Sequence, residues 1–140
     1  MNKDFLQCLY EYLTNSQELT SIVGQNIFPL FIPQNEQIPA LIYYPISTNY
    51  DTALQKDTGF VRTIIQFDCH DKTFKKARQL SRIVKKIFQN FSGDMNGIRV
   101  EATFIKSDLV INDSANNKFD AKDTIHIIEF EFYFIENKEE

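Results

Sequence analysis

The sequence predicts an α+β fold, an antiparallel four-stranded or slightly larger sheet with helices packed on one face, in the order α-α-β-β-α-β-β. Three observations support it. Several segments alternate apolar and polar residues with the period of a half-buried strand. A long amphipathic helix separates two pairs of them. The 13 Phe and 6 Tyr suit strands, and 140 residues fit a single domain, 1–140, with one core.

Two helices are expected at the start of the chain. Residues 4–14 carry apolar side chains at helical spacing. Asn15 is predicted to cap a second, short helix, with Glu18 at the capping-box position. Gly24 is the predicted C-cap, because glycine adopts a positive φ at little cost. The apolar stripes are Phe5, Leu6, Leu9, Tyr12 and Leu13 in the first helix, and Leu19, Ile22 and Val23 in the second.

The connection 25–38 is too apolar for a free loop and contains two prolines, which bar a regular helix. We expect Ile27 and Phe28 to pack on the core as a short extended piece. Pro39 suits the start of a strand, where its missing N–H does least harm.

Four strands are predicted, at about 40–47, 59–69, 98–107 and 124–136. The last three alternate clearly. The expected buried rows are Val61, Thr63, Ile65, Phe67 and Cys69, then Ile98, Val100, Ala102 and Phe104, then Ile128, Phe130, Phe132 and Phe134.

Two polar segments, 48–58 and 108–123, are expected as loops that contact other macromolecules and become ordered on binding. Their acidic candidate interface residues are Asp51, Asp57, Asp113 and Asp120. The acidic tail 136–140 is expected to fray.

A third helix is predicted from about 72 to 91, with Asp71 as N-cap and Gly93 as its stop. Its expected buried face is Phe74, Ala77, Leu80, Val84, Ile87, Phe88 and Phe91.

The charge of the chain is uneven. The net charge is −4, yet residues 71–86 sum to +6 and leave −10 for the rest. The cations are Lys72, Lys75, Lys76, Arg78, Arg82, Lys85 and Lys86. Three interpretations remain open: a solvated helix face, a face that meets an acidic surface of a neighbouring subunit, or contact with nucleic-acid phosphates.

Residues 68–71, Asp-Cys-His-Asp, form the one dense cluster of reactive residue types. Adjacent strand residues point to opposite faces, so Cys69 and His70 should diverge. No second Cys/His cluster completes a four-ligand metal site. We therefore expect Cys69 inside, His70 at the strand end and no metal.

Glu129 and Glu131 share one strand face, roughly 6.6 Å apart at about 3.3 Å per residue. Paired carboxylates can serve glycoside hydrolysis, but a charged row beside a phenylalanine row is the usual solvated side of a sheet. His126 is expected to be a packed residue. The four glycines form no phosphate-binding loop or nucleophile elbow. The prediction is a non-enzyme without cofactors.

Two cysteines, Cys8 and Cys69, do not make a disulfide framework. No signal peptide or run of ~20 apolar residues is visible. The sequence predicts a soluble protein made in a reducing cytoplasm, with no membrane partner.

Several short motifs follow one another along the chain, and their order is informative. They are Val23-Gly24, Ile27-Phe28-Pro29, Pro33-Gln34, Ile38-Pro39-Ala40, and the strand from Val61 to Cys69 followed by Phe74-x-x-Ala77-x-x-Leu80. In this order they resemble the tail-completion proteins of long-tailed bacteriophages, the tail terminator or head-tail joining family. Gln25-Asn26 stand where that family usually has an arginine.

The resemblance implies an α+β structural protein of the virion, in its tail-neck region, that assembles in the host cytoplasm as a ring, commonly a hexamer. Such a ring caps the tail tube, ends its growth and offers the surface that joins the head. The implied partners are further copies of the chain, the major tail tube protein and a head-completion or connector protein, with DNA passing through unbound. Two alternatives remain: a head-closure connector, and a nucleic-acid-binding regulator that uses the basic residues 72–86.

Overall fold

The computed structural model describes residues 4–33, 38–52, 57–112 and 124–136. Within these ranges the order of elements is α-α-β-β-β-α-β-β-β. The elements are α1 (Phe5–Thr14), α2 (Gln17–Val23), β1 (Ile27–Pro29), β2 (Ala40–Thr52), β3 (Asp57–Asp71), α3 (Phe74–Phe88), β4 (Gly93–Met95), β5 (Ile98–Asn112) and β6 (Thr124–Ile135). The α+β class is confirmed.

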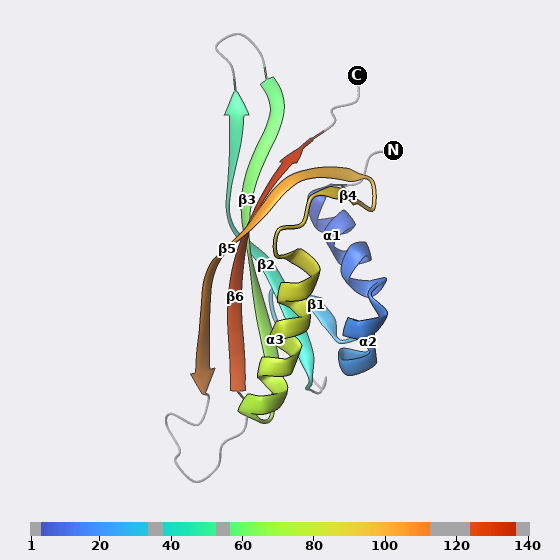
Figure 1. Cartoon of the computed structure of the whole chain (residues 1–140), viewed down its shortest axis with the longest axis vertical. Helices are drawn as coiled ribbons and strands as arrows, with labels where there is room; N and C mark the ends of the chain where they lie inside the picture. The colour runs from blue at the N-terminus through green and yellow to red at the C-terminus, as the bar shows by residue number, and fades with distance from the viewer. Residues whose placement is uncertain (1–3, 34–37, 53–56, 113–123, 137–140) are drawn as a thin grey trace.

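The described strands form one curled, half-barrel sheet in the order β1-β2-β3-β6-β5-β4, with the helices on one face (Figure 1). The sheet has six strands among the described residues, where four or slightly more were expected. The prediction missed β1 and β4, which have three residues each and so show no alternation. A wholly antiparallel sheet is also wrong, because β1 runs parallel to β2. Ile27 is buried, as predicted for the extended piece.

Parts of both polar segments predicted as loops are strand, and residues 53–56 and 113–123 of these segments lie outside the described residues. β2 continues to Thr52 and β3 starts at Asp57, while β5 continues to Asn112. Pairing with the neighbouring strand extends β2, β3 and β5 into segments that carry several polar residues. The two long hairpins, β2–β3 and β5–β6, project from opposite ends of the sheet (Figure 1).

Two predicted helix caps are wrong. Asn15 ends α1, with its N–H bonded to the carbonyl of Glu11, and Ser16 caps α2. Asp71 still belongs to β3, so Thr73 caps α3 by accepting from the N–H of Lys76 at 3.1 Å. The helix then ends at Phe88, before the predicted Gly93 stop. Gly24 closes α2 with a φ of 60°, as predicted.

The core is a cluster of phenylalanines between the sheet and the helices. Phe88 of α3 lies 5.3 Å from Phe67, 5.3 Å from Phe132 and 6.0 Å from Phe130, ring centre to ring centre. Phe5 of α1 stacks on Phe134 at 4.4 Å. The predicted buried row of β6 is confirmed in full. None of the helices in the described ranges is long and apolar enough to cross a membrane.

Two predicted core residues are exposed. Phe74 begins α3 beyond the sheet and is 55% exposed. Phe104 is 51% exposed, because a register shift between Val100 and Ala102 turns Thr103 inward in its place. A single inserted residue moves every following side chain to the other face.

Candidate assembly surfaces

The candidate residues from the sequence do not converge on one site. The cations gather on α3, over the helical face of the sheet, while Glu129 and Glu131 lie on its opposite, outer face. Asp51 and Asp57 belong to β2 and β3, in the stretch 51–58 whose side chains the structure does not describe. Asp113 and Asp120 lie outside the described residues. The molecule therefore offers separate surfaces, which we take in turn.

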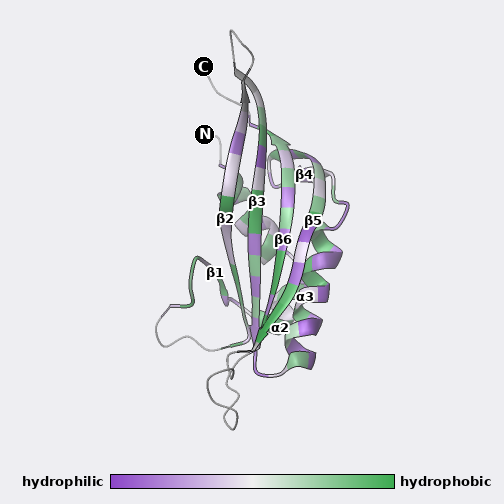
Figure 2. Cartoon of the chain, turned by 90° about the vertical axis from the view of Figure 1, so that its left-hand side faces the viewer, coloured by the Kyte–Doolittle hydropathy of each residue, from purple (hydrophilic) through white to green (hydrophobic). Residues whose placement is uncertain are grey.

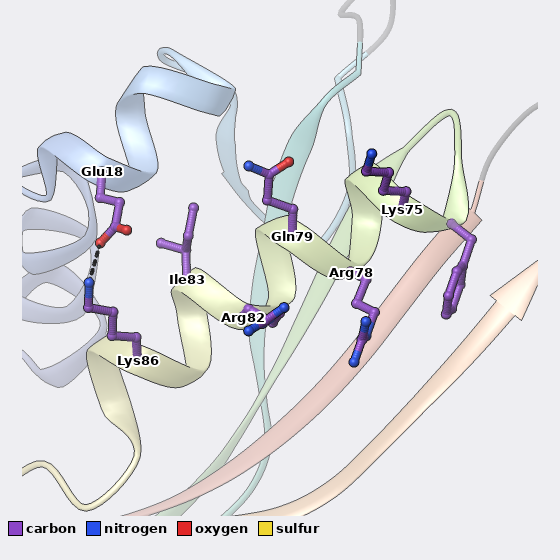
Figure 3. Close-up of a pocket in the computed structure, with 8 residues that line it drawn as sticks. Glu18, Lys75, Arg78, Gln79, Arg82, Ile83 and Lys86 are labelled. Carbon is purple, nitrogen blue, oxygen red and sulfur yellow. Dashed lines mark hydrogen bonds and ion pairs between the residues drawn. The ribbon is translucent and has the colours of Figure 1, made fainter.

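A basic groove runs along the exposed side of α3, with a volume of about 720 Å³ (Figure 3). Four cations line it, together with one carboxylate from α2 and an exposed aromatic ring. The lining residues are Glu18, Phe74, Lys75, Arg78, Gln79, Arg82, Ile83 and Lys86. Glu18 is held by Lys86 at 3.3 Å. The remaining cations stand in solvent, an arrangement that attracts an acidic surface or another anion.

Lys72 precedes α3 and Lys76 lies outside the basic groove, and both are exposed. Lys85 differs from the other predicted cations, because it is half-buried and turned to the sheet. Its Nζ lies 2.5 Å from Oδ2 of Asp108 on β5. One of the seven predicted interface cations is thus internal.

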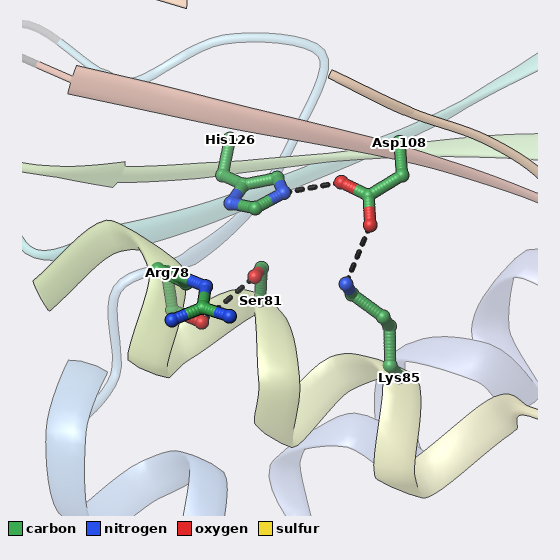
Figure 4. Close-up of polar contacts among 5 residues, drawn as sticks. All are labelled: Arg78, Ser81, Lys85, Asp108 and His126. Carbon is green, nitrogen blue, oxygen red and sulfur yellow. Dashed lines mark hydrogen bonds and ion pairs between the residues drawn. The ribbon is translucent and has the colours of Figure 1, made fainter. Parts of the chain in front are cut away.

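A polar cluster of Lys85, Asp108 and His126 joins α3 to β5 and β6 (Figure 4). Asp108 accepts from Lys85 through one oxygen and contacts Nε2 of His126 through the other. Burial alone would raise the pKa of Asp108, but the hydrogen bonds from Lys85 and His126 outweigh it and lower that pKa. The sequence analysis missed this cluster because it placed Asp108 in a loop.

Ser81, His126 and Asp108 are the residue types of a hydrolase triad and come together beneath α3 (Figure 4). The hydroxyl of Ser81, however, donates to the carbonyl oxygen of Arg78 at 2.8 Å. Ser81 is fully buried, with 0% of its surface exposed. A substrate cannot reach this hydroxyl, so the cluster fastens a helix to the sheet. His126 is packed, as predicted.

Cys69 is fully buried, as predicted, and burial raises the pKa of its thiol. Asp71 is also buried, and it accepts from the N–H of Lys72 at 2.7 Å. In the described ranges, no group of three His, Cys, Asp or Glu residues could hold a metal ion. Cys69 thus belongs to the core, and Asp71 holds the backbone where β3 ends.

The outer face of the sheet carries paired charges and rings. Glu131 is only 6% exposed, which the sequence analysis did not foresee, and its carboxylate lies 2.9 Å from Nε of Arg62 and 4.0 Å from Nζ of Lys106. Phe60, Tyr133 and Phe104 line up across three strands, 6.0 and 5.9 Å apart. Side chains from the neighbouring strands thus bury Glu131 on the face that was predicted to be solvated.

Both edges of the sheet have long unpaired stretches. β1 covers Leu41–Tyr43 of β2, and β4 covers Ile98–Val100 of β5. Among the described residues, no strand pairs with the outer side of β2 beyond Tyr43 or of β5 beyond Val100. The two unpaired stretches are staggered along the strands: Tyr50 lies level with Val100 and Tyr44 with Ser107, so β2 is free toward one end of the sheet and β5 toward the other.

The last part of β5 is regular and apolar. Residues 107–112, which we call the β5 edge segment, pair with β6 without interruption. Leu109, Val110 and Ile111 are 46%, 42% and 45% exposed. Figure 2 views the outer face and shows this end of β5 as a hydrophobic ribbon. An exposed, hydrophobic edge strand is a surface that invites another strand.

Comparison with known proteins rests on structure. No protein-family profile and no curated protein sequence matches the chain. It is similar to a chain in the solved virion of a native gene transfer agent particle, with a TM-score of 0.70 and 11% identity over 94% of each chain. It is also similar to a second solved protein, which carries no descriptive name, with a TM-score of 0.61 and 15% identity over 99% of each. At these identities the likeness shows a shared fold.

Proposed function

We propose that the chain is a structural component of a phage-like virion, and that it acts as a tail-completion protein. In this role, copies form a ring, with a hexamer as the expected size, that caps the tail tube, ends its growth and presents the joining surface for the head. The observation that carries the proposal is the match of nearly the whole fold to a chain of a gene transfer agent virion. The order of motifs around Gly24, Ile27 and Pro39 supports the narrower assignment.

The surface also supports an assembly role. The basic groove along α3 suits an acidic neighbouring surface, and the rest of the chain is strongly acidic. The cluster that resembles a catalytic triad is closed to substrates. The proposed partners are therefore macromolecular: other copies, the tail tube protein and a connector at the head. DNA passes through the ring without specific binding, since an acidic lumen repels its phosphates.

Two measurements test the proposal. Native mass spectrometry across protein and salt concentrations should reveal a closed ring of defined size. Deleting the gene from its particle should give tails of uncontrolled length without heads, and the intact gene should restore both. A strict monomer that fails to restore tail length would overturn the proposal.

A head-closure connector is the runner-up, because the fold match is to a virion chain whose position the match alone leaves open. Immunogold labelling of purified particles separates the two. Label retained on headless tails supports tail completion, whereas label retained on tailless heads supports head closure.

A further inference from the structure

We infer that the β5 edge segment pairs with the free edge of β2 in the next copy of this chain, so that one sheet continues from subunit to subunit. The inference rests on the proposed ring and names the contact that builds it. Edge strands expose unpaired N–H and C=O groups, and natural proteins usually protect them with charge, proline or bulges. The contrast between the two edges of this sheet carries the argument.

The β5 edge segment lacks such protection. It has no proline, and both register shifts of β5 lie before it, between Val100 and Ala102 and between Ile105 and Ser107. Its one charge, Asp108, is turned inward and held by Lys85 and His126. Leu109, Val110 and Ile111 follow, each nearly half exposed. The segment is straight, hydrophobic and able to accept a neighbouring strand.

The free part of β2 is a partner of matching chemistry. From Tyr44 to Tyr50 it carries no charged residue, and it exposes Ile46 (46%) and Tyr50 (61%). Pro45 and the register shift beside it restrict where a strand can pair. Pairing is therefore expected over residues 46–50, an uncharged stretch between Ile46 and Tyr50, so that the contact buries no charge.

Topology fixes the direction of the contact. β2 is antiparallel to β3, β3 to β6, and β6 to β5, so β2 and β5 run in opposite directions within one subunit. A second copy placed head-to-tail therefore sets its β2 antiparallel to the first copy's β5. Such a contact between two different patches generates a ring when the rotation closes.

Residues 108–110 of the β5 edge segment lie level with the part of β2 that β1 covers, not with residues 46–50, so successive copies are offset along the strands. A ring of subunits with such an offset closes when the strands are inclined to the ring axis, as they are in barrels. The competing arrangement, β5 against β5 in a twofold dimer, would leave Ile46 and Tyr50 of both copies exposed. The head-to-tail contact covers both edges with one type of interface.

Cysteine crosslinking of the full chain tests the contact. Leu109 lies on the outer face, as do Ser47 and Asn49, whereas Thr48 faces the helical side. We expect the double variants Leu109→Cys/Ser47→Cys or Leu109→Cys/Asn49→Cys to give an oxidised ladder that ends at the ring size. The matched control Leu109→Cys/Thr48→Cys, with its thiols on opposite faces, should not. The native Cys8 and Cys69 are buried and do not interfere.

Other outcomes overturn the inference. A covalent dimer from Leu109→Cys alone means that β5 pairs with β5. A ring that forms without crosslinks in either outer-face pair means that another surface joins the copies, while the proposed function stands. A crosslinked ladder in a protein that does not restore tail length keeps the strand contact and rejects the tail role.

A substitution gives an independent readout. Leu109→Lys should weaken ring association by roughly tenfold or more, because a lysine on an edge strand opposes pairing with another strand. Tyr10→Lys is the matched control, since Tyr10 is 40% exposed and lies on α1, outside both edge strands and outside the basic groove. Equal weakening by the two variants would argue against the edge contact, provided that both monomers keep the wild-type melting temperature.

Discussion

The two faces of the sheet are built differently. The helical face holds a packed group of rings, with Phe67, Phe88, Phe130 and Phe132 fully buried. The outer face is held by lateral contacts between strands, such as Arg62 with Glu131 and the hydrogen bond from Gln66 to Tyr44. One face therefore supplies most of the folding free energy, while the outer face and the edges beside it remain free for contacts with other subunits.

Truncating the centre of the helical face should have the largest effect. Phe88→Ala removes a fully buried ring that contacts Phe67, Phe130 and Phe132, and should lower the free energy of unfolding by about 3–5 kcal/mol. The control is Phe104→Ala on the outer face, half exposed and touching Tyr133, with a loss below about 1 kcal/mol. Urea unfolding at one fixed, low protein concentration compares them. Similar losses would refute the distinction between the faces.

The Lys85–Asp108–His126 cluster should give the next largest effect, and one that depends on pH. Because the pKa of Asp108 is lowered from 3.8 in the folded state, its contribution is present above that value and is lost as the pH falls through the folded pKa. Asp108→Asn should lower the free energy of unfolding by about 1–2 kcal/mol at pH 7. This is less than the loss expected for a fully buried charged hydrogen bond, because the side chain of Asp108 is 35% exposed.

Unfolding of wild type and Asp108→Asn across pH provides the measurement. The two curves should converge as the pH falls below 3.8 and stay apart from pH 5 to 7. Asp94→Asn, a change on the exposed Asp94 of β4, is the control and should not alter the pH dependence. A constant difference between wild type and Asp108→Asn over the whole range would mean that this carboxylate is not held in its charged form.

The sequence predicted the fold best where apolar and polar residues alternate over many positions. Long periodic segments were predictable, because a row such as Ile128 to Phe134 exceeds what chance alternation produces. The class, the helical side and most of the core followed from such rows. The three-residue strands β1 and β4 have too few residues to show a period.

The strand extensions and register shifts were not predictable for a different reason. Residues 108–112 pair with β6 on one side, a long-range contact that the local sequence does not reveal. The shift between Val100 and Ala102 exposes Phe104 and buries Thr103, although simple alternation assigns them the reverse. As a result the cluster around Asp108 and the β5 edge segment, the features most relevant to stability and assembly, fell inside a predicted loop.

On the outer face, removing one charge should have a smaller effect. Glu131→Gln keeps the shape of a buried side chain but ends its ion pair with Arg62, and should cost about 1 kcal/mol, because the 41% exposed side chain of Arg62 can be hydrated instead. Glu129→Gln, on the same strand and face, is the matched control and should be nearly neutral. Thermal unfolding at low and high salt compares the pair. A larger loss in Glu129→Gln would show that the outer face is organised around that residue instead.

The smallest effect on folding belongs to the basic groove, which lies on the exposed side of α3. Arg82→Glu should change the free energy of unfolding by less than about 0.5 kcal/mol, because exposed charges contribute little to stability. If the groove meets an acidic neighbour, the same change should weaken association and remove its sensitivity to salt, since screening acts on that attraction.

Lys76→Glu makes the same charge change on the same helix, but outside the groove, and should leave association nearly as it was. Sedimentation at 50 and 500 mM salt separates the outcomes. Equal weakening by both variants would assign the effect to net charge rather than to the groove, and no effect from either would make this face of α3 a solvated one.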